Sequence, residues 1–166
     1  MALRTEYIDF EDERTRLMDR MEELAEKQAG FAEDSTRAQR LLIEGNALNN
    51  QRNILEHLAE EWGVDGVELA GLTAGEVNRV EDTVENNPQV RERDAWVAVG
   101  THDAPYLDHD PENIVQDAYE QTVVNVTDLP LPYVRWAEAK ISDLSHLGAD
   151  EGNGYLALVR DKRGET

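Results

Sequence analysis

Four apolar residues in the first half of the chain lie seven positions apart: Leu41, Leu48, Leu55 and Trp62. This heptad spacing keeps the apolar side chains on one side of a helix, where they can pack against another helix. Asp34, Ser35 or Thr36 can cap the start of the segment, and Gly63 is placed to end it in a left-handed conformation. The spacing therefore predicts a helix that runs from about residue 36 to residue 62.

A second amphipathic segment precedes this helix. Apolar positions recur at three- and four-residue steps through residues 7–28, with charged residues filling the other faces, and Ala29-Gly30 interrupts the pattern. The two segments together predict an antiparallel helical hairpin or a short coiled coil over residues 1–62. In that arrangement the heptad residues either pack on the first helix or are free to bind a helix of another protein.

After Gly63 the chain changes to shorter segments. Val67–Ala70 is typical of a strand, and Thr73 with Glu76 forms a capping box for a helix that ends near Asn86. Ala95–Val99 fits either a buried strand or the end of a helix, because periodicity does not separate the two for so short a segment.

The last third carries further start and stop signals. Asp110 and Pro111 predict a helix start, the β-branched residues that follow predict an extended segment over 123–132, and Pro132 can begin a final helix that ends at Gly148. Tyr155–Val159 is a candidate short strand.

We expect a mainly α fold, with α+β as the alternative. The expected parts are the hairpin at 1–62, a small helical domain with a few short strands at 63–150, and a short strand or turn with a frayed tail at 151–166.

The charge balance is strongly acidic, with 36 Asp and Glu against 16 Lys and Arg and a net charge of −20. Self-repulsion of this size is screened at molar ionic strength, where the Debye length falls to about 3 Å. The acids are spread over both halves of the chain, which argues against an acidic disordered tail and against a nucleic-acid mimic. We therefore expect a protein of a high-salt cytoplasm. Because Lys and Arg are not clustered, we expect no nucleic-acid binding.

The sequence lacks the residues that several classes of function require. The chain has no cysteine, which removes disulfides and thiolate chemistry. No window is apolar enough for a membrane span, no apolar leader follows Met1, and no phosphate-binding or nucleophile motif is present. We expect no membrane contact, no enzyme activity and no cofactor.

One loop, Thr101–Asp110, concentrates two imidazoles and three carboxylates. Its spacing matches no established zinc site, so we interpret it as a solvated acidic loop without a metal. A metal-assisted hydrolase that uses this loop remains a second alternative, and its ligands would be His102, Asp103, Asp108 and His109.

Aromatic residues near prolines suggest a surface for a partner. Tyr106, Tyr133 and Trp136 lie in or next to segments expected to be extended, where an exposed groove is plausible. The predicted partner-binding residues are therefore these three together with Leu41, Leu48, Leu55 and Trp62.

Three stretches carry a family resemblance: VELAGLTAGE at Val67–Glu76, WVAVG at Trp96–Gly100, and LPLPYV at Leu129–Val134 leading into the final helix. Over residues 64–148 the chain resembles tail assembly chaperones of long-tailed viruses, and the hairpin before Gly63 departs from that pattern. The resemblance implies a non-catalytic factor that binds the tape-measure protein and recruits tail-tube subunits. With the acidic composition it implies a virus or provirus of a haloarchaeal host. The alternative is a structural virion component, such as a head-tail connector or tail protein, and self-association into a homo-oligomer is open in either case.

Overall fold

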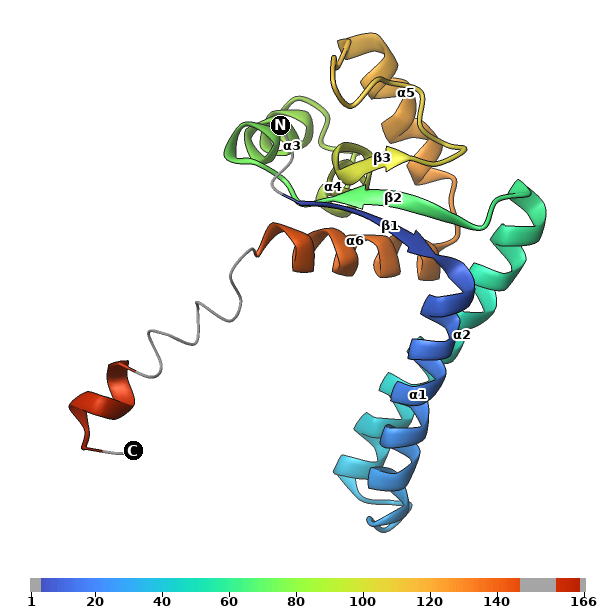
Figure 1. The fold of residues 1–166 in the computed structure, drawn as a ribbon, viewed down its shortest axis with the longest axis vertical. Helices are drawn as coiled ribbons and strands as arrows, with labels where there is room; N and C mark the ends of the chain where they lie inside the picture. The colour runs from blue at the N-terminus through green and yellow to red at the C-terminus, as the bar shows by residue number, and fades with distance from the viewer. Residues whose placement is uncertain (1–3, 147–157, 165–166) are drawn as a thin grey trace.

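The computed structural model describes residues 4–146 and 158–164. It is mainly helical with one three-stranded antiparallel sheet (Figure 1), which confirms the predicted fold class. The elements in chain order are β1 (Thr5–Asp9), α1 (Phe10–Ala29), α2 (Thr36–Trp62), β2 (Gly66–Ala70), α3 (Ala74–Asn86), α4 (Glu92–Gly100), β3 (Thr101–Asp103), α5 (Gln116–Thr127) and α6 (Leu131–Ser145).

The sheet has β2 at its centre, between β1 and β3. β1 pairs with β2 from Thr5 opposite Ala70 to Asp9 opposite Gly66. The expectation of a helix from residue 7 was wrong at this end, because residues 5–9 form a strand. A strand of five residues depends on pairing with a neighbouring strand, and the neighbour here, β2, is about 60 residues further along the chain.

The helical hairpin connects these two neighbouring strands. β1 runs directly into α1, and α2 returns to β2 through a short turn in which Gly63 has a φ of +64°. Asp9 caps α1 by accepting from the backbone N–H of Asp12 at 3.0 Å, and Ser35 caps α2 by accepting from that of Ala38 at 3.1 Å. The predicted hairpin is therefore confirmed.

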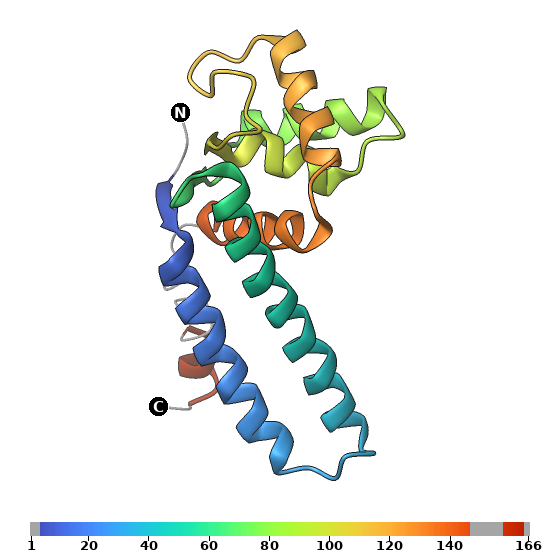
Figure 2. The same cartoon turned by 90° about the vertical axis from the view of Figure 1, so that its right-hand side faces the viewer.

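The hairpin projects from the rest of the molecule. At 1.5 Å per residue, α1 is about 30 Å long and α2 about 40 Å. Figure 2 shows the two helices side by side, with their connecting loop at the end furthest from the other elements. Below, "the body" means the sheet with α3 to α6.

The cap that the sequence predicted in the body is found on α3. Both hydrogen bonds of the Thr73–Glu76 capping box are present at the start of α3. The ambiguous segment Ala95–Val99 is helical and belongs to α4. α6 has Pro132 in its first turn, as expected, and ends at Ser145, before the predicted end at Gly148.

The helix expected after Pro111 is present as α5, but both of its ends were predicted incorrectly. Asp110 does not cap a helix: its side chain accepts from the backbone N–H of Glu112 at 2.9 Å within a turn. The helix begins at Gln116 and continues to Thr127, through residues expected to be extended. Val123 and Val126 are three residues apart, so a helix buries both on one side, and this burial outweighs the weak helix propensity of valine.

The strand expected at Tyr155–Val159 lies mostly outside the described residues, and residues 158–162 are helical. None of the helices that the structure describes has the length and apolar character needed to cross a membrane.

A single hydrophobic core joins the hairpin to the body. It includes Phe10 and Leu17 of α1 and Leu55 and Leu58 of α2 together with side chains of the sheet and of α3 to α6. α6 runs along one face of the sheet (Figure 1). Because core residues come from both sides of residue 62, the base of the hairpin is part of the same folding unit as the body.

Candidate functional site

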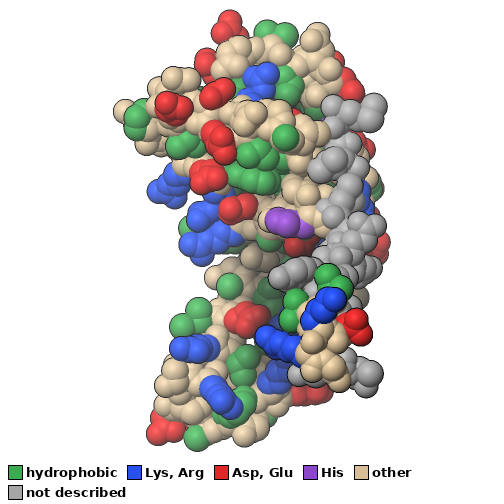
Figure 3. Space-filling view, turned by 90° about the vertical axis from the view of Figure 1, so that its left-hand side faces the viewer, with side chains coloured by type: hydrophobic (Ala, Val, Ile, Leu, Met, Phe, Trp, Pro, Cys, Tyr) green, Lys and Arg blue, Asp and Glu red, His purple; other side chains and the backbone are tan. Residues whose placement is uncertain are grey.

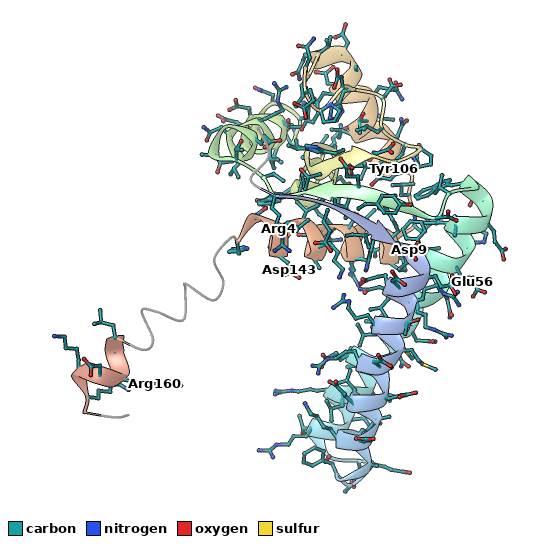
Figure 4. The ribbon with its side chains drawn as sticks, viewed as in Figure 1. Arg4, Asp9, Glu56, Tyr106, Asp143 and Arg160 are labelled. Carbon is teal, nitrogen blue, oxygen red and sulfur yellow. The ribbon has the colours of Figure 1, made fainter. Side chains whose placement is uncertain are left out.

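Five aromatic rings lie in a continuous row where the hairpin meets the body. Neighbouring centroids are 5.3–5.9 Å apart along the row, which consists of Phe10, Trp136, Tyr133, Trp62 and Tyr106. Edge-on and tilted packing of this kind stabilises a core. Figure 4 shows Tyr106 beside β3, at the end of the sheet that is next to α2.

This burial corrects the prediction of an exposed aromatic groove. Tyr106, Tyr133 and Trp136 are all buried, and only Trp62 is partly exposed. Tyr133 and Trp136 lie on α6, the helix that the sequence predicted from Pro132, and the error was the expectation of an exposed groove beside it. Their role in the structure is to hold the hairpin to the body.

The two tyrosines share a chain of buried hydroxyl groups. The Tyr106 hydroxyl lies 2.8 Å from that of Thr101 and 2.7 Å from that of Tyr133. Burial raises the pKa of Tyr106 to about 12, and burial together with the neighbouring Tyr106 raises the pKa of Tyr133 well above its usual value. Both phenols therefore stay protonated at neutral pH, which suits a structural hydrogen-bond chain.

A carboxylate is buried beside the aromatic row. Glu13 of α1 is 5% exposed. One of its oxygens accepts from the indole N–H of Trp136 at 3.0 Å and from the Lys140 ammonium at 2.9 Å, and the other accepts from Nε of Arg16 at 3.1 Å. These contacts connect α1 to α6 through one ionised group.

The electrostatics of Glu13 follow from these partners. Burial by itself raises the pKa of the carboxyl, but the hydrogen bonds from Arg16, Lys140 and Trp136 outweigh burial, so the pKa lies below its usual value. The group is therefore charged at neutral pH. It is fully engaged with internal partners, which fits a structural ion pair better than an acid-base catalyst.

The loop after β3 is not the solvated acidic loop that we expected. His109 is 4% exposed. Its Nδ1 lies 2.9 Å from the hydroxyl oxygen of Thr122 on α5, and the same oxygen accepts from the backbone N–H of Asp108 at 2.9 Å. Asn125 donates to the Tyr106 carbonyl at 3.0 Å. The loop is thus attached along α5, with Asp103 and Asp108 pointing to solvent.

These residues do not meet as a metal site. Within residues 4–146 and 158–164, no three His, Asp or Glu side chains come together in a way that could hold a metal ion. Nε2 of His102 and Nε2 of His109 are buried and have no hydrogen-bond partner in the part of the chain that is described. The arrangement thus gives no support to the metal-assisted hydrolase.

The buried imidazole predicts a specific response to acid. Burial lowers the pKa of His109, and Arg79 and His102 add to this effect, while Asp110 and Asp108 oppose it. A lowered pKa means that the unfolded chain binds the proton more readily, so stability should fall as the pH drops below the usual imidazole value. We expect the free energy of unfolding, measured by urea titration, to decrease from pH 7 to pH 5.

The contribution of His109 is separable by substitution. In His109→Gln the decrease with acid should be smaller than in the unsubstituted protein, and in His146→Gln, where the side chain is exposed, it should be unchanged. Equal decreases in the protein and in both variants would contradict the assignment.

The heptad residues face the inside of the hairpin. Leu55 is fully buried, whereas Leu41 and Leu48 are partly buried beside α1. Leu55 is thus unavailable to a partner in this fold, which corrects its place among the binding residues. Partner binding by Leu41 and Leu48 stays a prediction.

Two exposed apolar residues of α2 directly follow the heptad residue Leu41. Leu42 is 42% exposed and Ile43 is 70% exposed. Two shallow grooves flank this surface. The first lies between the hairpin helices and is lined by Met21, Leu24, Ala25, Gln28, Leu41, Leu42, Gly45, Asn46 and Asn49. The second, the α2–α6 groove, is lined by Ile43, Asn46, Ala47, Asn50, Gln51, Leu131, Pro132 and Arg135.

Sequence reasoning missed Ile43 and Leu131. Both are large apolar side chains outside the heptad positions, and a heptad analysis assigns such residues to no particular surface. A signal was present, because Ile43 and Ala47 are one helical turn apart and both lie off the seam.

Comparisons of the chain with protein-family models, with curated proteins and with solved structures give no match.

Proposed function

We propose that this protein is a non-catalytic assembly factor that binds a helical segment of another protein through its α1–α2 hairpin. The role that fits is that of a tail assembly chaperone in a virus or provirus of a high-salt host, with the tape-measure and tail-tube proteins as partners. The protein would then act in the host cytoplasm before the virion is complete.

The observation that carries this proposal is the projecting hairpin with uncovered apolar side chains on α2. A two-helix hairpin leaves part of each helix without a packing partner, and a third helix can complete the bundle. Ile43 at 70% exposure is the clearest such position. Exposed apolar side chains beside shallow grooves are typical of protein interaction surfaces.

Co-expression tests the proposal directly. With the tape-measure protein of the same virus, in a high-salt host, we expect a soluble complex that survives purification in molar KCl. Failure to associate at any salt concentration would contradict the chaperone role. Stoichiometric copies in purified virions would favour the alternative of a structural virion component.

The acidic composition gives a second, separate prediction. Because the net charge is −20, the folded state is repelled by its own charge in dilute buffer, and molar salt screens this repulsion. We expect the thermal midpoint, followed by circular dichroism, to rise from dilute to molar KCl. A flat or falling midpoint would rule out adaptation to a high-salt interior.

A further inference from the structure

The two helices of the hairpin differ sharply in charge. α1 has 20 residues, of which seven are Asp or Glu. The first 20 residues of α2, positions 36–55, contain a single acid, Glu44, and three arginines, Arg37, Arg40 and Arg52. Glu44 lies toward α1, where it pairs with Arg20 at 3.6 Å. The first 20 residues of α2 are therefore almost free of acids, although the protein as a whole is strongly acidic.

The α2–α6 groove lies in this acid-free part of the surface. It is about 370 Å³ in volume, and of its eight lining residues none is acidic and one, Arg135, is basic. Figure 3 shows the molecule narrowing between the body and the hairpin, with Lys and Arg above the narrowing, and with hydrophobic side chains among Lys, Arg and a few acids on the hairpin below it. A solvated surface of this protein would be expected to carry acids, so their absence here indicates a surface that is covered when the protein acts.

The shape of the groove suits a helix. Ile43 and Ala47, one turn apart on α2, supply one apolar wall, and Leu131 with Pro132 at the start of α6 supplies the other. An apolar stripe at helical spacing fits between walls of this kind. The other α2 side chains that line the groove, Asn46, Asn50 and Gln51, are amides, which donate hydrogen bonds without adding charge.

The charge at the rim selects among partners. Arg135 lines the groove, and Arg40 precedes Ile43 by one helical turn. Carboxylates on the flanks of an incoming helix would meet these guanidinium groups, whereas lysines there would be repelled. A second copy of this chain is less suited, because a two-fold contact would place Arg135 near its own copy with no acid in the groove to neutralise the pair.

We infer that the α2–α6 groove is a docking site for an amphipathic helix of a partner protein, one whose apolar stripe is flanked by Asp and Glu. This inference rests on the proposed function and names the place and the partner chemistry within it.

Two synthetic peptides test the charge preference. Both carry Leu and Ala on one helical face; one has Glu at the flanking positions and the other has Lys there. Binding is followed by fluorescence anisotropy at the lowest KCl concentration that keeps the protein folded. We expect the Glu peptide to bind at least about tenfold more tightly than the Lys peptide. The net charge of −20 attracts the Lys peptide to the rest of the surface, so a preference for the Glu peptide would have to come from the groove. Equal binding or a preference for the Lys peptide would overturn the inference.

Substitutions test the location. Ile43→Asp and Arg135→Glu should each weaken binding of the Glu peptide about tenfold or more. The matched control is Val124→Asp on α5. Like Ile43→Asp, it replaces an exposed β-branched apolar side chain by an acid, and Val124 is 54% exposed. All three sites are exposed, so thermal midpoints should match that of the unsubstituted protein. A groove variant that binds normally, or a control that binds as poorly as Ile43→Asp, would overturn the location.

The outcomes separate this inference from the proposed function. If the tape-measure protein is captured equally by the unsubstituted protein and by Ile43→Asp, the groove inference fails and the proposed function stands. If the Glu peptide binds in the groove but no tape-measure protein is captured, the groove inference stands and the proposed function fails. If the protein is a dimer that Ile43→Asp converts to a monomer, a second copy occupies the groove and the inference is overturned.

Discussion

Glu13→Ala is expected to destabilise the protein by about 3–5 kcal/mol, because it breaks a buried ion pair by removing one partner. The substitution leaves Lys140 and the indole N–H of Trp136 without their acceptor at the junction of α1 and α6. It also leaves a cavity beside Trp136. Urea unfolding followed by tryptophan fluorescence measures the loss, since Trp136 is itself in the affected region.

A matched control separates burial from charge. Glu11→Ala removes the same group two positions earlier on α1, where the side chain is exposed, and should change stability by less than about 0.5 kcal/mol. Similar losses in the two variants would show that Glu13 is not the acceptor described above.

The ionised state of Glu13 also predicts part of the acid response. Its pKa in the folded protein lies below the usual carboxyl value of 4.5, so its stabilising contribution is present above that value and is lost as the pH falls through the lowered pKa. The Glu13→Ala variant should therefore lose less stability than the unsubstituted protein over the most acidic part of a titration. Parallel curves in that range would contradict the lowered pKa.

Gly71→Ala is expected to cost about 1–3 kcal/mol, as overpacking of a tight interior does. A Cβ at this position would lie 2.4 Å from the Leu144 carbonyl oxygen and 2.7 Å from the Ser145 backbone nitrogen. These are backbone atoms near the end of α6, and they cannot move aside without shifting the helix. Thermal or urea unfolding measures the effect.

Gly75 is the matched control, because it lies four residues further on and a Cβ there would meet nothing within 4 Å. Gly75→Ala is in the first turn of α3 and should be neutral or slightly stabilising, since alanine has the higher helix propensity. The sequence motif GLTAG gives no indication that the two glycines differ in packing. A cost at Gly75 as large as that at Gly71 would contradict the packing of α6 against the start of this turn.

The parts of the fold that the sequence predicted depend on neighbours along the chain. The heptad residues from Leu41 to Trp62 predicted α2, and the Thr73–Glu76 capping box predicted the start of α3. Both signals involve residues within one or two helical turns, where the backbone geometry is fixed by local hydrogen bonds and spacing. The fold class followed from the same signals.

The parts that were missed depend on contacts between distant segments. β1 is a strand because β2 pairs with it, and α5 is a helix because Val123 and Val126 are buried on one side. For β1 the three- and four-residue periodicity pointed to a helix, and for α5 the β propensity of valine pointed to an extended segment. Tertiary packing outweighs propensities of a few tenths of a kcal/mol per residue.

The candidate site shows the same division. The sequence determined that α2 is a helix, and its order of residues already contains the acid-poor stretch and the step from Ile43 to Ala47. Only the tertiary structure decided that Tyr106, Tyr133 and Trp136 are buried, that Glu13 is the one carboxylate of α1 enclosed by α6, and that Leu131 lies across a groove from Ile43. The physical reason is that burial and charge pairing depend on which distant helices come together, and no spacing within one helix encodes that.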